Sequence, residues 1–181
     1  MQFGALGAGI MAALGLAGLP RTAAAQSEAI VQSWSEGAAL AQAGRYAEAE
    51  VQLKAALGQA EQELGMENVV TARLLGSLGQ VYHADGRDLQ AEDLLRRALA
   101  AREAALGPAD PIVAEGLSDL GVLLYSQGRY DEAQPLLERA LSLREAGLGA
   151  DDPVLARSLR NLAELYQRQG RYQRVDEFGP S

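Results

Sequence analysis

Four glycines that recur every 42 residues constrain this chain more than any other feature of its sequence. They are Gly44, Gly86, Gly128 and Gly170, and a second series with the same interval comprises Gly65, Gly107 and Gly149. In the first series, three glycines open the triplet Gly-Arg-Tyr and one opens Gly-Arg-Asp. A period of about 20–50 residues is typical of stacked repeat proteins, in which no single unit buries its own apolar face. The interval therefore predicts a repeat array, and hence a binding role rather than catalysis.

Within each period, apolar residues recur at helical spacing on both sides of the Gly-Arg triplet. Before Gly128 they are Leu117, Leu120 and Leu124, and after it they are Ala133, Leu137, Ala140 and Leu141. This spacing predicts two amphipathic helices per repeat, joined by a tight turn in which glycine adopts positive φ at little cost. We expect helices over about 27–43, 46–64, 69–85, 88–106, 111–127, 130–148 and 153–169, with a short segment from 172.

The helix starts carry capping signals at the same interval. Asp110 precedes Pro111, and Asp152 precedes Pro153. An aspartate N-cap followed by proline at the first helical position is a favoured way to begin a helix. The first such junction has no proline, but Asn68 stands where the aspartates stand later and is expected to cap as well.

The composition favours a helical core and excludes several classes of site. The chain has 181 residues, only 5% of them aromatic, so leucine and alanine must build the core. It has no cysteine, which excludes disulfides and thiolate metal sites. The net charge of −8 argues against non-specific nucleic-acid binding, which would require a basic stripe.

The first 25 residues differ from the rest. An uncharged run from Phe3 to Leu19 is followed by Ala23-Ala24-Ala25, the small-x-small pattern of a signal-peptidase site. We therefore expect residues 1–25 to be a signal peptide cleaved after Ala25, and the protein to be exported to the bacterial periplasm or secreted. The n-region lacks a basic residue, and two alternatives stay open: an uncleaved membrane anchor, although the run is short for a span, and a misassigned start codon.

The repeats resemble a known family. The third repeat has small and large residues in a characteristic order, at Leu117, Leu120, Gly121, Leu124, Gly128, Tyr130, Ala133, Leu137 and Ala140. This order resembles the tetratricopeptide repeat (TPR). The 42-residue length and the segment Leu-Arg-Glu-Ala-Gly-Leu-Gly-Ala-Asp-Asp-Pro at 143–153 are similar to the kinesin-light-chain type. The resemblance implies an all-α fold, a right-handed α-solenoid of antiparallel helix pairs with about three and a half repeats.

The implied organisation is an array over 26–178 with a short tail over 179–181. Its repeats lie at about 26–67, 68–109 and 110–151, with an incomplete fourth at 152–178. Where two helices of a repeat approach closely, the small residues are Ala49, Ala91 and Ala133, and the leucines one turn later are Leu53, Leu95 and Leu137. We expect both sets to be buried.

The two ends of the array depart from the family pattern. Glu36 occupies the position held later by Leu78, Leu120 and Leu162, as expected of a first repeat with no neighbour on that side. At the other end the second helix of the fourth repeat is short, so the apolar side of the preceding helix is expected to be partly uncovered. Its residues are Leu155, Leu159, Leu162 and Tyr166. A homodimer through that end, a truncated gene or fragment of a longer TPR protein, and tolerated exposure remain alternatives.

The first helix of each pair lines the concave side of such an array, and the resemblance places the partner-binding groove there. The expected groove residues are Arg73, Ser77, Gln80, His83, Glu115, Asp119, Tyr125, Arg157, Asn161, Glu164 and Arg168. Asn161 matches an asparagine that relatives use to bind peptides, whereas Ser77 and Asp119 replace it in the other repeats. Trp34 falls on the same side, either as an exposed anchor or as part of the packing. The competing interpretation is a solvated face with pairs within one helix.

The sequence offers little basis for catalysis. The segment Gly7-Ala8-Gly9-Ile10-Met11-Ala12 resembles a dinucleotide-binding pattern, but no strand precedes it and it lies in the leader. His83 is the only histidine, and no nucleophile turn accompanies it. We therefore predict a protein that is not an enzyme, with no cofactor and no metal. We expect it to bind a peptide or helix of a partner protein, with no nucleic acid, and to meet a membrane only if the leader is uncleaved.

Overall fold

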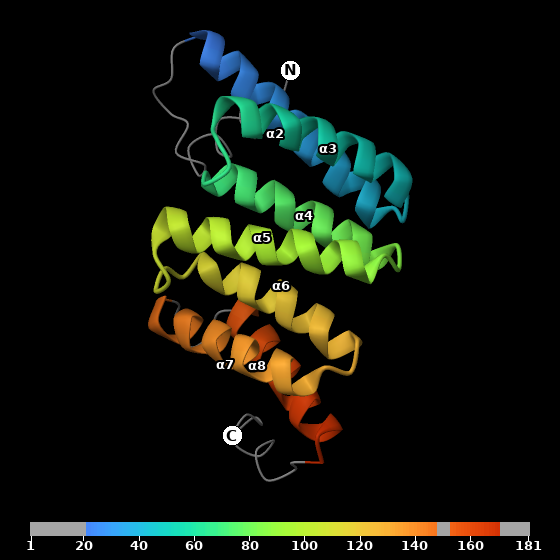
Figure 1. Ribbon diagram of the computed structural model, residues 1–181, viewed down its shortest axis with the longest axis vertical. Helices are drawn as coiled ribbons and strands as arrows, with labels where there is room; N and C mark the ends of the chain where they lie inside the picture. The colour runs from blue at the N-terminus through green and yellow to red at the C-terminus, as the bar shows by residue number, and fades with distance from the viewer. Residues whose placement is uncertain (1–20, 148–152, 171–181) are drawn as a thin grey trace. The chain divides into compact units, whose positions relative to one another are not determined.

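The computed structural model describes residues 21–147 and 153–170, and these residues form seven helices and no strand. The helices are α2 (Arg21–Gln42), α3 (Tyr46–Glu63), α4 (Val69–Ala84), α5 (Asp88–Leu106), α6 (Val113–Ser126), α7 (Tyr130–Gly147) and α8 (Pro153–Arg168) (Figure 1). The predicted all-α repeat array is therefore confirmed. The chain divides into two compact units after Ala101, within α5, and each unit is described separately below. Three of the predicted features lie outside the described residues, namely Gly149, Asp152 and the helical segment from 172.

The turns form as the glycine series predicts. Gly44, Gly86 and Gly128 have φ of 73°, 77° and 76°, a conformation that residues with a Cβ rarely adopt. After each, the next amide donates back to a carbonyl of the preceding helix, as from Arg87 to Tyr82 at 2.8 Å. The helix then ends and the chain reverses into the second helix of the repeat.

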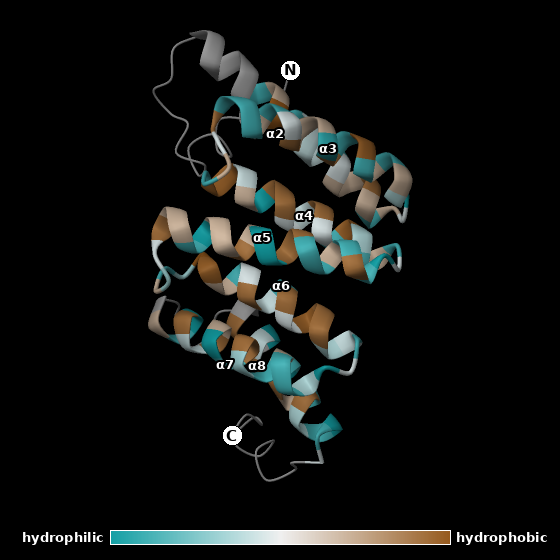
Figure 2. Ribbon diagram, viewed as in Figure 1, coloured by the Kyte–Doolittle hydropathy of each residue, from teal (hydrophilic) through white to brown (hydrophobic). Residues whose placement is uncertain are grey.

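The two helices of a repeat approach most closely at a glycine. A Cβ on Gly37, Gly79 or Gly121 would lie 2.8 Å from a side-chain carbon of Leu53, Leu95 or Leu137 respectively. The alanines and leucines expected at these junctions are buried, with Leu53 and Leu95 at most 2% exposed. The two kinds of helix also differ in hydropathy. The first helices α4 and α6 are mainly hydrophobic or neutral (brown and white in Figure 2), whereas the second helices α5 and α7 carry more hydrophilic residues (teal).

In unit 1 the first repeat is the polar end of its stack. Glu36 is exposed, as expected for a terminal repeat, while Leu78 at the equivalent position of α4 is 2% exposed. The N-cap prediction is also confirmed, because the Asn68 side chain accepts a hydrogen bond from the Val70 amide at 2.8 Å.

In unit 2 one expectation about the C-terminal end is wrong. Leu155, Leu162 and Tyr166 were expected to be partly uncovered, but all three are buried, and only Leu159 is half-buried. The reason is that α8 packs against both α6 and α7. The Tyr166 hydroxyl also donates to Glu138 of α7 at 2.5 Å.

Two helix starts differ from the prediction. α2 begins at Arg21 rather than near 27, so the predicted cleavage site after Ala25 falls inside a helix of the structure. α6 begins at Val113 rather than at Pro111. Asp110 accepts a hydrogen bond from the Ile112 amide at 2.8 Å, but the N-cap of α6 is Ile112 and no side chain caps it, so the predicted N-cap role of Asp110 is wrong. Residues 110–113 form a turn that is closed by a hydrogen bond from the Val113 amide to the Asp110 carbonyl, three residues earlier, at 3.0 Å. An i→i+3 bond of this kind belongs to a tighter turn than the α-helix, so this turn lies outside α6.

Candidate partner-binding surface

The first helices of unit 2 present a stripe of side chains outside the apolar core. On α6 the buried residues leave Glu115, Asp119 and Val122 outside, at spacings of four and three residues. Because α6 and α8 pack together, the outward residues of α8 continue this stripe. We call the combined set the α6–α8 surface, comprising Glu115, Asp119, Val122, Tyr125, Arg157, Asn161, Glu164 and Arg168.

An aromatic residue and an arginine are joined at one end of the α6–α8 surface. Arg168, in the last turn of α8, donates a hydrogen bond to the Tyr125 hydroxyl on α6, and this bond together with the nearby Tyr125 and Tyr130 hydroxyls raises the pKa of Arg168. The Tyr125 ring also meets the Tyr130 ring, with centroids 5.5 Å apart and planes tilted by 50°. Tyr125 is therefore held from two sides while remaining only half-buried.

The rest of the α6–α8 surface carries both charges. Arg157 and Glu164 are exposed and Asn161 is half-buried, so α8 offers a cation, an anion and an amide along one side. On α6, Glu115 lies 3.6 Å from the buried guanidinium of Arg102. Val122, 37% exposed, is the apolar residue between these polar groups. A surface of this composition suits a partner with mixed polar and apolar side chains.

Unit 1 carries the other predicted groove residues, but Ser77 is already engaged. The Trp34 indole donates to the Ser77 hydroxyl at 2.9 Å, and Arg73 lies 6.0 Å from the centre of the Trp34 ring. Trp34 is half-buried and bonded to α4, which favours the packing role over that of an exposed anchor. Gln80, one turn further along α4, is exposed.

His83 is held by its own repeat. Its Nδ1 lies 2.7 Å from Oδ1 of Asp88, the first residue of α5. Among the described residues, no group of three or more histidine, aspartate or glutamate side chains is placed to hold a metal ion. The acidic pair Asp131 and Glu132 occupies the first turn of α7, where the helix dipole favours carboxylates. His83, in the last turn of α4, therefore contacts the first residue of α5 and joins the two helix ends.

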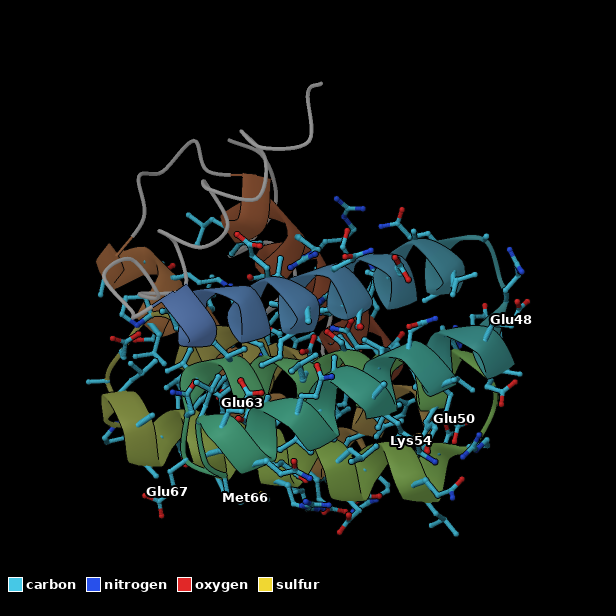
Figure 3. The ribbon with its side chains drawn as sticks, turned by 90° about the horizontal axis from the view of Figure 1, so that it is seen from above. Glu48, Glu50, Lys54, Glu63, Met66 and Glu67 are labelled. Carbon is cyan, nitrogen blue, oxygen red and sulfur yellow. The ribbon has the colours of Figure 1, made fainter. Side chains whose placement is uncertain are left out.

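Two polar clusters were missed by the sequence reasoning. In unit 1, Glu50 of α3 accepts from Tyr82 at 2.8 Å, from Arg87 at 2.5 Å and from Lys54 at 2.6 Å. These partners, Arg87 first, lower the pKa of Glu50 from 4.5 to about 2. Arg87 also lies 3.7 Å from the centre of the Tyr82 ring. Figure 3 shows Glu50 and Lys54 near the same end of α3. The cluster links the first repeat to the second.

In unit 2, a buried arginine links the third repeat to the fourth. Arg144 of α7 is 3% exposed, and its Nη1 donates to the hydroxyls of Ser118 at 2.7 Å and Ser158 at 2.6 Å. The sequence contained a signal for this position. Arg144 lies four residues after Ala140, in phase with the buried face of α7, and Arg102 precedes it by 42 residues. A charge that recurs in core register is best explained by burial with a partner.

None of the helices among residues 21–147 and 153–170 combines the length and the apolar character that crossing a membrane requires. The predicted signal peptide and the alternative anchor concern residues 1–25, of which 1–20 lie outside the described part of the chain.

Comparison with known proteins agrees with the geometry. The family model described as "Tetratricopeptide repeat" matches residues 27–104 and 112–178. Nothing among the curated proteins matches. Among solved structures, BtubC (BKLC) from P. vanneervenii is similar with a TM-score of 0.75 and 22% identity, covering 96% of this chain and 68% of that one.

Two further structures support the same fold. A putative kinesin light chain from Podosopora anserina, with nearly identical TPR-like repeats, gives a TM-score of 0.75 at 23% identity and covers 82% of this chain and 71% of that one. The Sgt2 TPR domain from Aspergillus fumigatus gives 0.59 at 20% identity, with 84% and 85% covered. These likenesses agree with the helix pairs described above. The chain belongs to the tetratricopeptide repeat family.

Proposed function

We propose that this protein binds a peptide or a single helix of a partner protein on the α6–α8 surface and catalyses no reaction. TPR arrays generally serve as scaffolds for protein–protein interaction, which supports the general role. The observation that carries the specific site is the half-buried Tyr125, whose ring lies 5.5 Å from that of Tyr130, on the same surface as the exposed Val122 and Arg168. Tyrosine and arginine are enriched among the residues that dominate binding energy at protein interfaces.

The geometry suggests roles for three residues of the proposed site. Tyr125 is half-buried and packs against Tyr130, which restricts its side chain before the partner arrives and so reduces the ordering cost of binding. Val122 offers the apolar contact. Asn161, whose amide both donates and accepts, suits the backbone of an extended segment or of a helix end, where backbone groups are unpaired.

In unit 1 we propose a supporting contact rather than a second anchor. Trp34 is tied to Ser77, and Arg73 lies near its ring, so these groups form a firm edge with Gln80 exposed beside it. This edge offers hydrogen bonding to a partner, whereas its large aromatic residue is half-buried in packing.

We further propose that the protein acts after export, in the periplasm or outside the cell. The support is the uncharged run before the alanine-rich segment at 23–25. N-terminal sequencing of the protein recovered from the exported fraction tests this. A first residue at 26 is the expected result, and an intact residue 1 in the cytoplasmic fraction would contradict it.

The binding proposal is tested by selecting peptides from a random library against the purified protein and titrating a selected peptide by calorimetry. Arg168→Ala and Tyr125→Ala should each weaken binding about 10-fold or more, as interface anchors do. The double variant Arg157→Glu/Asn161→Ala should do the same. Arg139→Ala, an arginine on α7, serves as the matched control and should bind like the wild type. Unchanged affinity in the first three variants, with the fold intact by circular dichroism, would remove the site.

A further inference from the structure

Arg144 is buried in unit 2 and reaches both helices of the α6–α8 surface. The side chain comes from α7 and is 3% exposed. Its Nη1 donates to the Ser118 hydroxyl of α6 at 2.7 Å and to the Ser158 hydroxyl of α8 at 2.6 Å. Its Nη2 donates to the Ala114 carbonyl of α6 at 3.3 Å. One buried side chain on a third helix is therefore bonded to both helices of the surface.

Each of these contacts is made one residue away from a member of the α6–α8 surface. The surface residues that adjoin the three contacts in sequence are Glu115, Asp119 and Arg157. Neighbouring side chains on a helix diverge by about 100°, so the contacted residue turns inward while its neighbour stays outside the core. The bonds of Arg144 therefore hold the stretches of backbone that carry the partner surface.

The two serines are a feature of this junction and not of the repeat. One period earlier, Arg102 is likewise 3% exposed. The residues that lie 42 positions before the two serines are glycines, Gly76 and Gly116. An arginine at this point of the second helix is thus buried without the two hydroxyls. Their presence around Arg144 adds hydrogen bonds that tie α6 to α8, where the partner surface lies.

We infer that Arg144 is a positioning residue for partner binding, which holds α6 and α8 at the spacing that the partner requires. The inference rests on the proposed function, since it concerns the same surface. The groups proposed to bind are divided between two helices, with Val122 and Tyr125 on α6 and Asn161 and Arg168 on α8. A partner that touches both helices binds more tightly when their separation is fixed beforehand, because less freedom is lost on binding. The planar guanidinium suits this role, since its donors keep a fixed geometry.

The first test measures the spacing of the two helices without any partner. Because the chain has no cysteine, Val122→Cys/Glu164→Cys places one spin label on the exposed side of each helix. The full chain should give a narrow distribution of label distances. Arg144→Met should broaden or displace this distribution, because the bonds to both serines are lost. The fold is expected to persist, since an apolar side chain can replace a buried charge at little cost. An unchanged distribution in Arg144→Met would overturn the inference.

The second test is the calorimetric affinity of the full chain for the selected peptide. Arg144→Met should weaken binding about 10-fold, within the range of about 2- to 30-fold for residues that act without touching the ligand. Ser158→Ala, which removes one of the two hydroxyl bonds, should weaken binding less. A purely structural role would lower the free energy of unfolding but leave the affinity of the folded protein unchanged. The titrations are therefore made where circular dichroism shows each variant to be folded.

Two matched controls keep the chemistry of each change but leave the link between α6 and α8 in place. Arg139→Met removes an arginine of the same helix, which bonds to Glu103 and to the Pro108 carbonyl. Ser126→Ala removes a serine hydroxyl of α6 that bonds within its own helix, to the Leu123 carbonyl at 2.7 Å. Both variants should bind the peptide like the wild type.

The outcomes separate this inference from the proposed function. If Tyr125→Ala weakens binding and Arg144→Met does not, the surface binds the peptide but the inference is overturned. If neither variant weakens binding, the proposed site fails, and the inference that Arg144 serves it fails as well. Weaker binding in both variants, together with altered label distances in Arg144→Met, is the result that the inference predicts.

Discussion

At the residue scale, the tightest constraint is a glycine against a leucine. In three repeats a Cβ on the glycine of the first helix would lie 2.8 Å from the leucine of the second, a separation that real Cβ atoms do not show. Glycine in a helix costs roughly 0.5–1 kcal/mol relative to alanine, so its presence here is explained by the close approach of the two helices. The period drew attention to the turn glycines, whereas these helical glycines act through packing.

Alanine substitutions at two helical glycines separate these effects. Gly58→Ala adds a methyl group in open space and should stabilise the protein by about 0.5–1 kcal/mol. Gly79→Ala gains the same helix propensity but presses on Leu95, which costs about 1–3 kcal/mol. Urea unfolding followed by the fluorescence of the single tryptophan, Trp34, measures the difference. Equal stability of the two variants would show that the helices are not in contact at Gly79.

Glu50 gives a prediction about pH. Its pKa falls from 4.5 to about 2 on folding, chiefly through the hydrogen bond from Arg87. A carboxylate with a lowered folded pKa stabilises the fold fully above its unfolded pKa, and the contribution is lost as the pH falls from about 4.5 toward 2. After allowance for the partly exposed Arg87 and Lys54, this contribution is about 2 kcal/mol.

The measurement compares Glu50→Gln with the wild type by denaturant unfolding between neutral pH and pH 2.5. The wild type should be more stable at neutral pH, and the gap should close as the pH approaches 2. Glu48→Gln is the control, because Glu48 pairs with Arg45 on the open surface and its replacement should change stability far less. A gap that stays constant with pH would mean that the charge of Glu50 is not the source of its contribution.

At the element scale, the placement of α8 depends on one buried cation. Arg144 of α7 reaches Ser118 on α6 and Ser158 on α8, so a single side chain joins three helices of unit 2. A buried guanidinium is stabilising only while its hydrogen bonds are satisfied. Removing one partner should therefore be more damaging than removing the arginine and its partner together.

A double-mutant cycle tests this dependence. Ser158→Ala should cost about 1–3 kcal/mol in the wild type, because it leaves part of the guanidinium unsatisfied. In an Arg144→Met background the same change should cost about 0.5 kcal/mol or less, since no buried charge remains to be satisfied. Additive effects in chemical unfolding would show that the serine and the arginine act independently.

Helix positions were largely predictable from the sequence because each turn is marked by a residue with few conformational alternatives. The starts of α3, α5 and α7 were predicted at 46, 88 and 130 and are observed there, directly after the Gly-Arg pair. The start of α6 was predicted two residues early, because the Asp110 side chain competes for an amide and tightens the turn. Local hydrogen bonding of this kind is not visible in a hydrophobic pattern.

At the scale of the whole molecule, the sequence predicted the family and which side of each helix is exposed. It did not predict which site residues contact each other between helices. The phase of the leucines determines which side of α6 is exposed, so Glu115, Asp119 and Tyr125 were predictable as surface residues. That Trp34 engages Ser77, or that Arg168 reaches Tyr125, depends on the distance between separate helices. The burial of Leu162 and Tyr166 was missed for the same reason, because it depends on how closely α8 approaches its neighbours.

The most direct test of the central claim is a chemical-shift map of a peptide that has been selected without reference to any site. On adding the peptide to isotopically labelled protein, the account predicts the largest amide shifts on the exposed side of α6 and α8, around Val122, Tyr125, Asn161 and Arg168. Largest shifts on the outer sides of α3, α5 and α7, with α6 and α8 unaffected, would contradict it.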